Sequence, residues 1–248
     1  MEQRELLRTR LREEVEAEER GYVEAFLKRE GGSIPVHLVR RWSNGFHADN
    51  KISERAFYKG IVSVSSEVQA VAIKVVTDVA SYLNEVKVLT ALQHPHLIPV
   101  LGHSPAEAVD SPSYIVFPYA ANRGVDSMLR NAVTAKLLTC AKRVTIASQV
   151  AEAMQYLHGT NLCHGRINTS NVVLTTDLTP KIINFGLATQ WTAAGCTNDV
   201  QTFGYFLRSV PHQPYLTHSL THLLTHLLTH LLTHSLAYSL TYLLTHSQ

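Results

Sequence analysis

Cysteine is scarce in this sequence, and acidic and basic residues nearly balance. The 248 residues include three cysteines, Cys140, Cys163 and Cys196, whose spacing fits neither a disulfide framework nor a zinc motif. The formal net charge is +2, so no excess of one sign favours binding to nucleic acid or to an acidic membrane. We therefore expect a protein of a reducing compartment that binds no metal, no nucleic acid and no membrane.

The N-terminal residues, MEQRELLRTR, lack the apolar core that a secretory signal peptide needs. By default this predicts a cytoplasmic protein. Apolar residues make up 45% of the chain and charged residues 17%, which is typical of a globular protein with a core of its own. The chain is not uniform, however, and falls into three segments.

The first segment, residues 1–33, has no proline and is rich in charge, with 16 charged residues between Met1 and Glu30. Apolar residues recur in it at helical spacing, namely Leu7, Leu11, Val15, Tyr22 and Phe26. The pattern predicts a charged amphipathic helix that packs one stripe on the next domain and ends at Gly31 and Gly32. A short coiled coil or an arm that binds a partner is the alternative.

The last segment, residues 216–248, contains no acidic or basic residue besides histidine and repeats Leu-Thr-His-Ser or Leu-Thr-His-Leu. A period of four fits neither a strand nor a helix well. The tetranucleotide CTCA, read in triplets, encodes Leu-Thr-His-Ser, so we interpret this low-complexity tail as translated simple-sequence DNA. A metal clip is a weaker interpretation, with ligands from His222, His226, His230 and His234. A membrane span is disfavoured, because about half of the positions are Thr or His.

The middle segment, residues 34–210, carries several short motifs in a fixed order. The sequence V-A-I-K at residues 71–74 follows F-Y-K-G at residues 57–60 at the distance expected of two strands and a turn. A lysine such as Lys74 can hold nucleotide phosphates when a carboxylate fixes its position. Glu85, in a segment with a helical pattern over residues 80–92, is the expected partner.

Further motifs follow towards the C-terminus. An apolar strand is expected at residues 114–117, followed by P-Y-A-A-N-R-G, and a helix at residues 146–158. After them come L-C-H-G-R-I-N-T-S-N at 162–171, I-I-N-F-G at 182–186 and D-V-Q-T-F-G at 199–204. Together with V-A-I-K and its glutamate, these motifs extend over most of the middle segment.

In order and spacing, the motifs resemble those of the protein-kinase superfamily, in its tyrosine-kinase-like branch. D-N-K-I at 49–52 and F-P-Y at 117–119 are similar to receptor-associated kinases of innate immunity. Y-K-G, V-A-I-K and L-H-G are similar to the mixed-lineage kinase domain-like pseudokinases. The resemblance implies an α+β, two-lobe fold with a small β-rich lobe at about 34–116. A helical large lobe at about 119–210 would be truncated after its central helix.

The resemblance also implies which residues would act, and several depart from the family pattern. Arg166 stands where the catalytic Asp belongs and Asn184 where the metal-binding Asp belongs. Gly165 replaces an Arg, and Phe57 replaces the Val that covers adenine. The three glycine positions of the phosphate loop hold Asn50, Ile52 and Arg55.

Other family positions are retained. The nucleotide contacts implied by the resemblance are Lys74, Glu85, Ala72, Ala120, Asn171 and Val173. The positions of the apolar spine hold Leu89, Val100, His164, Phe185 and Asp199. These assignments predict a pseudokinase without a magnesium site, which binds ATP weakly at most and acts through a protein partner in signalling. A kinase with residual phosphotransfer and a non-functional fragment from an incomplete gene model are the alternatives.

Overall fold

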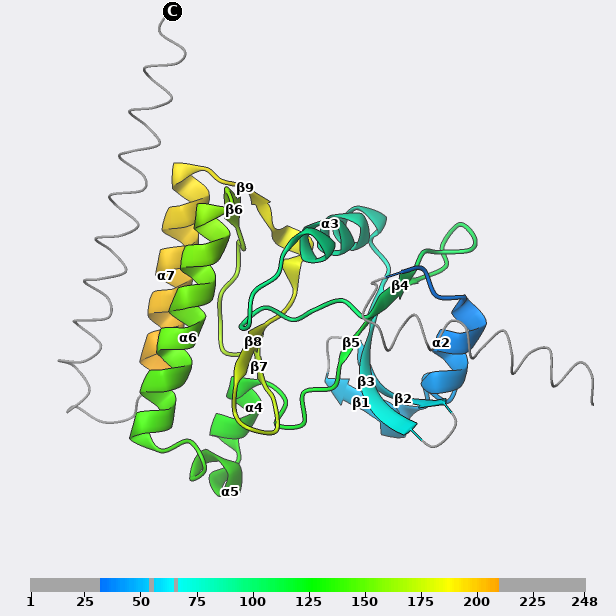
Figure 1. Cartoon of the computed structure of the whole chain (residues 1–248), viewed down its shortest axis with the longest axis horizontal. Coiled ribbons are helices and arrows are strands. Elements are labelled where there is room, and N and C mark those ends of the chain that lie inside the picture. The colour runs from blue at the N-terminus through cyan, green and yellow to red at the C-terminus, as the bar shows by residue number, and fades with distance from the viewer. Residues whose placement is uncertain (1–31, 54–55, 65–66, 210–248) are drawn as a thin grey trace, which may run out of the picture. The chain divides into compact units, whose positions relative to one another are not determined.

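The computed structural model describes residues 32–53, 56–64 and 67–209 (Figure 1). Nearly all of the predicted N-terminal helix, the histidine-rich repeat and Arg55 lie outside these residues. The chain divides into two compact units. Among the described residues the first unit comprises 32–91 and 99–119, and the second comprises 92–98 and 120–209.

The first unit is built on a five-stranded antiparallel sheet with the order β1-β2-β3-β5-β4. Its strands are β1 (Lys51–Ser53), β2 (Phe57–Val64), β3 (Glu67–Val76), β4 (Gly102–Ser104) and β5 (Ser113–Pro118). The V-A-I-K motif lies in β3, between β2 and β5. Because successive strand residues point to opposite faces, Val71 and Ile73 are fully buried on one face while Lys74 is directed to the other.

Helices are packed against this sheet within the first unit. Helix α2 (Val36–Trp42) buries Leu38, Val39 and Trp42 in one apolar cluster with the strand residues. A short 3-10 turn, η1 (Ala48–Asn50), leads into β1. Helix α3 (Val79–Ala91) begins where the Asp78 carboxylate accepts a hydrogen bond from the Ser81 backbone N–H at 2.8 Å, as expected of an N-cap.

The second unit is mainly helical. Its helices are α4 (Val125–Arg130), α5 (Ala132–Ala135), α6 (Cys140–Gly159) and α7 (Ala193–Ser209). The short antiparallel pairs are β6 (Leu162–Cys163) with β9 (Thr189–Gln190) and β7 (Val172–Leu174) with β8 (Pro180–Ile182). A 3-10 turn, η2 (Phe185–Leu187), connects β8 to β9.

Helices α6 and α7 lie side by side (Figure 1). Apolar residues at helical spacing form the buried face of α6, among them Ile146, Val150, Met154 and Leu157. Helix α7 buries Phe203 and Phe206, and it begins at Ala193, six residues before the D-V-Q-T-F-G motif. No helix within the described ranges is long and apolar enough to cross a membrane.

Candidate functional site

A buried ion pair joins β3 to α3 in the first unit. The Lys74 Nζ atom lies 2.5 Å from Glu85 Oε2, with 14% of the lysine side chain and none of the glutamate side chain exposed. The second carboxylate oxygen, Glu85 Oε1, is buried and has no hydrogen-bond partner among the described residues. The pair predicted from the sequence is therefore formed, and it fixes a cation at the middle of the sheet.

Phe57 lies directly beside this lysine. The two residues are paired across β2 and β3, and Lys74 Nζ is 5.8 Å from the centroid of the Phe57 ring. The ring also contacts Phe117 of β5 at a centroid distance of 6.4 Å and is 9% exposed. Phe57 thus occupies space next to the ion pair.

Two of the three residues at the phosphate-loop positions are described. Asn50 ends η1, and its side-chain Nδ2 donates a hydrogen bond to the Ser43 carbonyl at 2.9 Å. Ile52 lies in β1. Ile52 carries a β-branched side chain, and the Asn50 side chain is hydrogen-bonded to the Ser43 carbonyl. Neither residue allows the close backbone approach that glycines give to phosphate.

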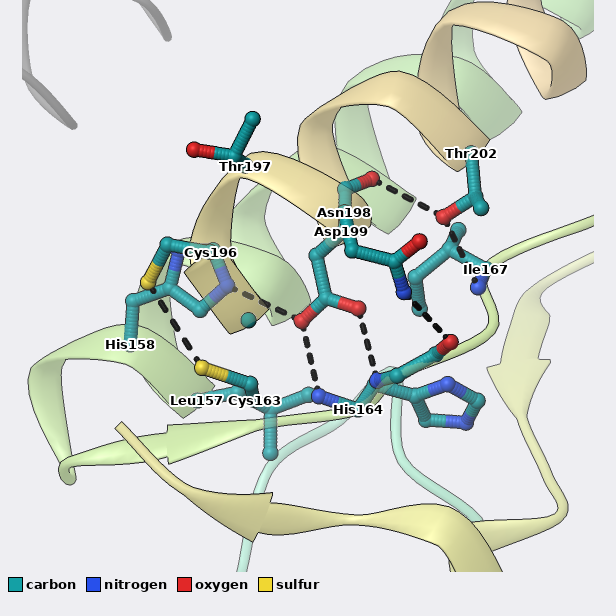
Figure 2. A network of polar contacts seen from close by, with 12 residues as sticks. Leu157, His158, Cys163, His164, Ile167, Cys196, Thr197, Asn198, Asp199 and Thr202 are labelled. Carbon is teal, nitrogen blue, oxygen red and sulfur yellow. Dashed lines mark hydrogen bonds and ion pairs between the residues drawn. The ribbon is translucent and has the colours of Figure 1, made fainter. Parts of the chain in front are cut away.

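In the second unit, Asp199 of α7 holds the start of the 162–171 loop (Figure 2). Its carboxylate is fully buried and accepts hydrogen bonds from the backbone N–H groups of His164 and Gly165, both at 2.7 Å. Asp199 Oδ2 also lies 3.1 Å from His158 Nε2 of α6. Because hydrogen bonds to an ionised acceptor are stronger than neutral ones, α7 fixes the backbone of this loop.

Gly165 adopts a conformation that suits glycine. Its φ is +83°, and a Cβ atom at this position would lie 2.9 Å from the Leu187 carbonyl oxygen. An L-residue such as the Arg of the family pattern would be strained there unless the 187 backbone moved.

The Arg166 side chain is exposed, and the Arg166 backbone takes part in the internal hydrogen bonds of the loop. Its N–H donates to His164 Nδ1 at 3.1 Å, and its carbonyl accepts from Asn171 Nδ2 at 2.9 Å. A guanidinium stays protonated in proteins and therefore cannot accept a proton from a substrate hydroxyl.

Asn168 organises the turn that follows, a role that the sequence analysis missed. Its Oδ1 accepts hydrogen bonds from Ser170 N, Ser170 Oγ and Asn171 N at 3.1, 2.8 and 3.0 Å. Asn followed two residues later by Ser is a usual signal for an Asx turn, and this signal could have identified the residue.

The two asparagines expected at the metal position bind each other. Asn184 Nδ2 donates to Asn171 Oδ1 at 2.7 Å, and Asn171 is 1% exposed. Asn184 has φ +69° and ψ +62°, a left-handed conformation that asparagine tolerates better than most residues. Magnesium prefers carboxylate and phosphate oxygens. This neutral donor set, already bonded to itself, does not fit a magnesium ion.

The remaining predicted residues are distributed over both units. Ala72 lies in β3 of the first unit, whereas Ala120 follows β5 and Val173 lies in β7, both in the second unit. Leu89 and Val100 are buried in the first unit. In the second unit the His164 and Phe185 rings meet edge to face at 4.7 Å. Adenine contacts by these alanines and Val173 stay a prediction.

The antiparallel sheet with its lysine–glutamate pair and the helical unit with its His164–Asn171 loop define the class of fold as that of a protein kinase. Comparison with known proteins agrees: the family described as "Protein tyrosine and serine/threonine kinase" matches residues 50–203, more than half of the chain. The chain belongs to this family. The predicted kinase fold with a β-sheet unit and a helical unit is confirmed.

Similar curated proteins are plant kinases. The chain is 30% identical over 211 residues to receptor-like serine/threonine-protein kinase SD1-7 of Arabidopsis thaliana, covering 77% of this chain and 24% of that protein. It is 37% identical over 114 residues to cysteine-rich receptor-like protein kinase 42 of the same plant, covering 44% and 17%.

A third relative is the salt tolerance receptor-like cytoplasmic kinase 1 of Oryza sativa subsp. japonica. The identity is 35% over 115 residues, covering 44% of this chain and 31% of that protein. The chain thus spans about a quarter of the length of the first of these relatives.

Proposed function

We propose that this chain is a pseudokinase of the tyrosine-kinase-like branch, similar to receptor-associated and mixed-lineage kinase domain-like proteins. It transfers no phosphate, binds ATP weakly without magnesium, and acts in the cytoplasm by binding a protein partner in signalling. The observation that carries the proposal is the 2.7 Å hydrogen bond from Asn184 to Asn171. In this bond, two neutral amide groups occupy the position that the family pattern gives to the metal ligands.

The physical argument concerns charge at the transferred phosphate. Kinase catalysis depends on metal ions that neutralise developing charge and on a carboxylate that accepts the hydroxyl proton. Asn184 and Arg166 occupy the corresponding family positions, and neither can supply these functions. The Lys74–Glu85 pair supports binding of the phosphates alone, since a fixed cation attracts them without a metal.

The test is a phosphotransfer assay with γ-labelled ATP, magnesium and a generic protein substrate, on the full chain. We expect no label above that of Lys74→Met. Lys59→Met is the matched control. Lys59 lies in the neighbouring strand β2, where its Nζ atom is 5.2 Å from the centroid of the Tyr119 ring, so its replacement leaves the Lys74–Glu85 pair intact. Label transferred by the wild type and by Lys59→Met, but not by Lys74→Met, contradicts the proposal.

The same ion pair favours a second candidate, a protein kinase with residual phosphotransfer activity. Lys74 and Glu85 are held as an active kinase requires, and the relatives bear the names of kinases. Such an enzyme needs a carboxylate near Asn171, and residues 164–171 contain none. The assay above separates the two candidates directly.

A further inference from the structure

One cluster of side chains in the second unit has the composition of a metal site. His158 of α6, Cys163 of β6 and Cys196 of α7 each offer a ligand atom, and these atoms lie within 4.8 Å of one another. The two cysteines are 33 residues apart in the chain, which is why their spacing predicted no site. The fold brings them together, and Figure 2 shows their sulfur atoms in contact.

We propose that His158, Cys163 and Cys196 bind a zinc ion.

The distances suit this ion. The two Sγ atoms are 3.6 Å apart. Thiolates at about 2.3 Å from a tetrahedral zinc lie roughly 3.8 Å from each other. A histidine nitrogen would be about 3.6 Å from each sulfur in the same geometry, so that the imidazole needs to move by at most about 1 Å. Three protein ligands and a water molecule form a set that zinc accepts.

His158 is oriented as a metal ligand. Its Nε2 lies 3.1 Å from the Asp199 carboxylate, which can only accept, so this nitrogen carries a proton. In the neutral imidazole the other nitrogen, Nδ1, carries the lone pair that a metal needs. Nδ1 is buried and has no hydrogen-bond partner among the described residues, and 3% of the side chain is exposed. A carboxylate that holds the far nitrogen of a ligating histidine is the usual outer partner in zinc sites.

Gly195 permits the close approach of α7 to β6. A Cβ atom at this position would lie 2.9 Å from Cys163 Sγ and 3.2 Å from Cys163 Cβ. Cys163 is fully buried, whereas Cys196 is partly exposed and offers the ion a route from solvent. Cys196, the residue after Gly195, is therefore held against Cys163 where the first turn of α7 packs on β6.

Binding would be coupled to loss of protons. Zinc binds cysteine as the thiolate. When zinc binds, each thiol releases one proton to solvent and each sulfur forms one bond to the ion, while His158 forms a third bond through Nδ1.

The proposed site would reinforce the loop that Asp199 holds. Its ligands come from the end of α6, from β6 and from the first turn of α7, and His158 contacts Asp199 directly. A ligand that binds the folded chain and not the unfolded one stabilises the folded chain. Zinc would thus hold residues 162–171 in place whether or not the loop performs catalysis.

The test is a cobalt titration of the full chain, reduced and freed of metal beforehand. Cobalt bound by thiolates gives a charge-transfer absorption that cobalt bound by imidazoles alone does not. This signal separates the site from the histidines at 222, 226, 230 and 234, because residues 216–248 contain no cysteine. We expect the absorption to saturate at a single ion per chain and to disappear when zinc is added.

Cys196→Ser is the informative variant, because this side chain is partly exposed, and Cys140→Ser is its matched control at an exposed cysteine outside the cluster. We expect Cys140→Ser to behave as the wild type. Cys196→Ser should lose the thiolate absorption and lower the zinc affinity more than about 100-fold, since outer partners alone contribute about 10- to 100-fold. Circular dichroism checks that Cys196→Ser is folded.

Melting with and without zinc provides a second readout. Zinc should raise the melting temperature of the wild type and of Cys140→Ser but leave that of Cys196→Ser unchanged. The proposal is overturned if the reduced wild type shows no thiolate absorption, or if the absorption survives in Cys196→Ser. It is equally overturned if the chain forms only a Cys163–Cys196 disulfide in air and takes up no cobalt when reduced.

Discussion

The two regions that the proposed function concerns pair their polar side chains in different ways. In the first unit Lys74 meets Glu85, a cation against an anion, and neither charge is tolerable in the interior without the other. In the second unit the Asn184 amide donates a hydrogen bond to the Asn171 amide oxygen, so the two neutral side chains bond directly to each other. The first region keeps the lysine and glutamate of the family pattern, whereas in the second region Asn184 stands where that pattern has an Asp. Under the proposed function, the first region attracts phosphate and the second holds no metal.

The largest effect is expected from breaking the charged pair. Lys74→Ala leaves the fully buried Glu85 without its partner, and we expect the free energy of unfolding to fall by about 3–5 kcal/mol. The double variant Lys74→Met with Glu85→Leu should recover most of this loss, because apolar residues of similar volume often replace a buried ion pair without cost. Urea unfolding of the three proteins measures both effects. A loss below about 1 kcal/mol for Lys74→Ala would show that the pair is solvated.

A second prediction concerns the backbone of the loop in the second unit. Gly165→Ala places a side chain at φ +83° and 2.9 Å from the Leu187 carbonyl, and should cost about 1–3 kcal/mol. Gly159→Ala is the matched control, since a Cβ atom there meets nothing within 4 Å at the end of α6. It should stabilise by about 0.5–1 kcal/mol, because alanine is the better helix residue. Effects of equal sign in thermal or urea unfolding would contradict this description of the loop.

A third prediction changes the neutral pair into one with charge. Asn184→Asp replaces the donor Nδ2 by an oxygen that faces Asn171 Oδ1, so we expect a loss of about 1–2 kcal/mol in the presence of a chelator. Magnesium with ATP should restore part of the loss, since a carboxylate is the ligand the ion prefers. The exposed Asn44 provides a control of the same charge change, Asn44→Asp, whose effect should stay within about 0.5 kcal/mol. Equal effects of the two variants would show that Asn184 does not depend on its partner.

The smallest effect is a pH dependence in the first unit. Burial lowers the pKa of His103, whose Nδ1 lies 2.8 Å from the Tyr82 hydroxyl. The unfolded chain therefore binds a proton there more readily than the folded chain does. This contribution to stability is complete above the ordinary histidine pKa of about 6.5 and is lost as the pH falls below it. Between about pH 8 and about pH 5, the urea midpoint should fall less in His103→Gln than in the wild type.

The exposed His37 of α2 is the control for that comparison. His37→Gln should follow the wild type across the same range of pH. If His103→Gln also follows it, then the acid sensitivity comes from other groups.

The elements near the kinase motifs could be predicted well from the sequence, because each rests on local pattern. The V-A-I-K motif, which follows F-Y-K-G at the distance of two strands and a turn, predicted β3. Helical spacing predicted α3, with Glu85 as the expected partner of Lys74. The contacts of the loop could not be predicted in this way. The bonds from His164 and Gly165 to Asp199 and the cysteine cluster depend on how α7 packs on β6, over separations of 33 to 35 residues that no local period encodes.

The most direct test of the account is calorimetric titration of ATP into the full chain with and without magnesium. Because Asn171 and Asn184 bind each other and offer no carboxylate, we predict weak binding whose Kd changes less than about twofold on adding the ion. A Kd that falls tenfold or more with magnesium, about 1.4 kcal/mol of added affinity, would show that a metal site survives and would contradict the account.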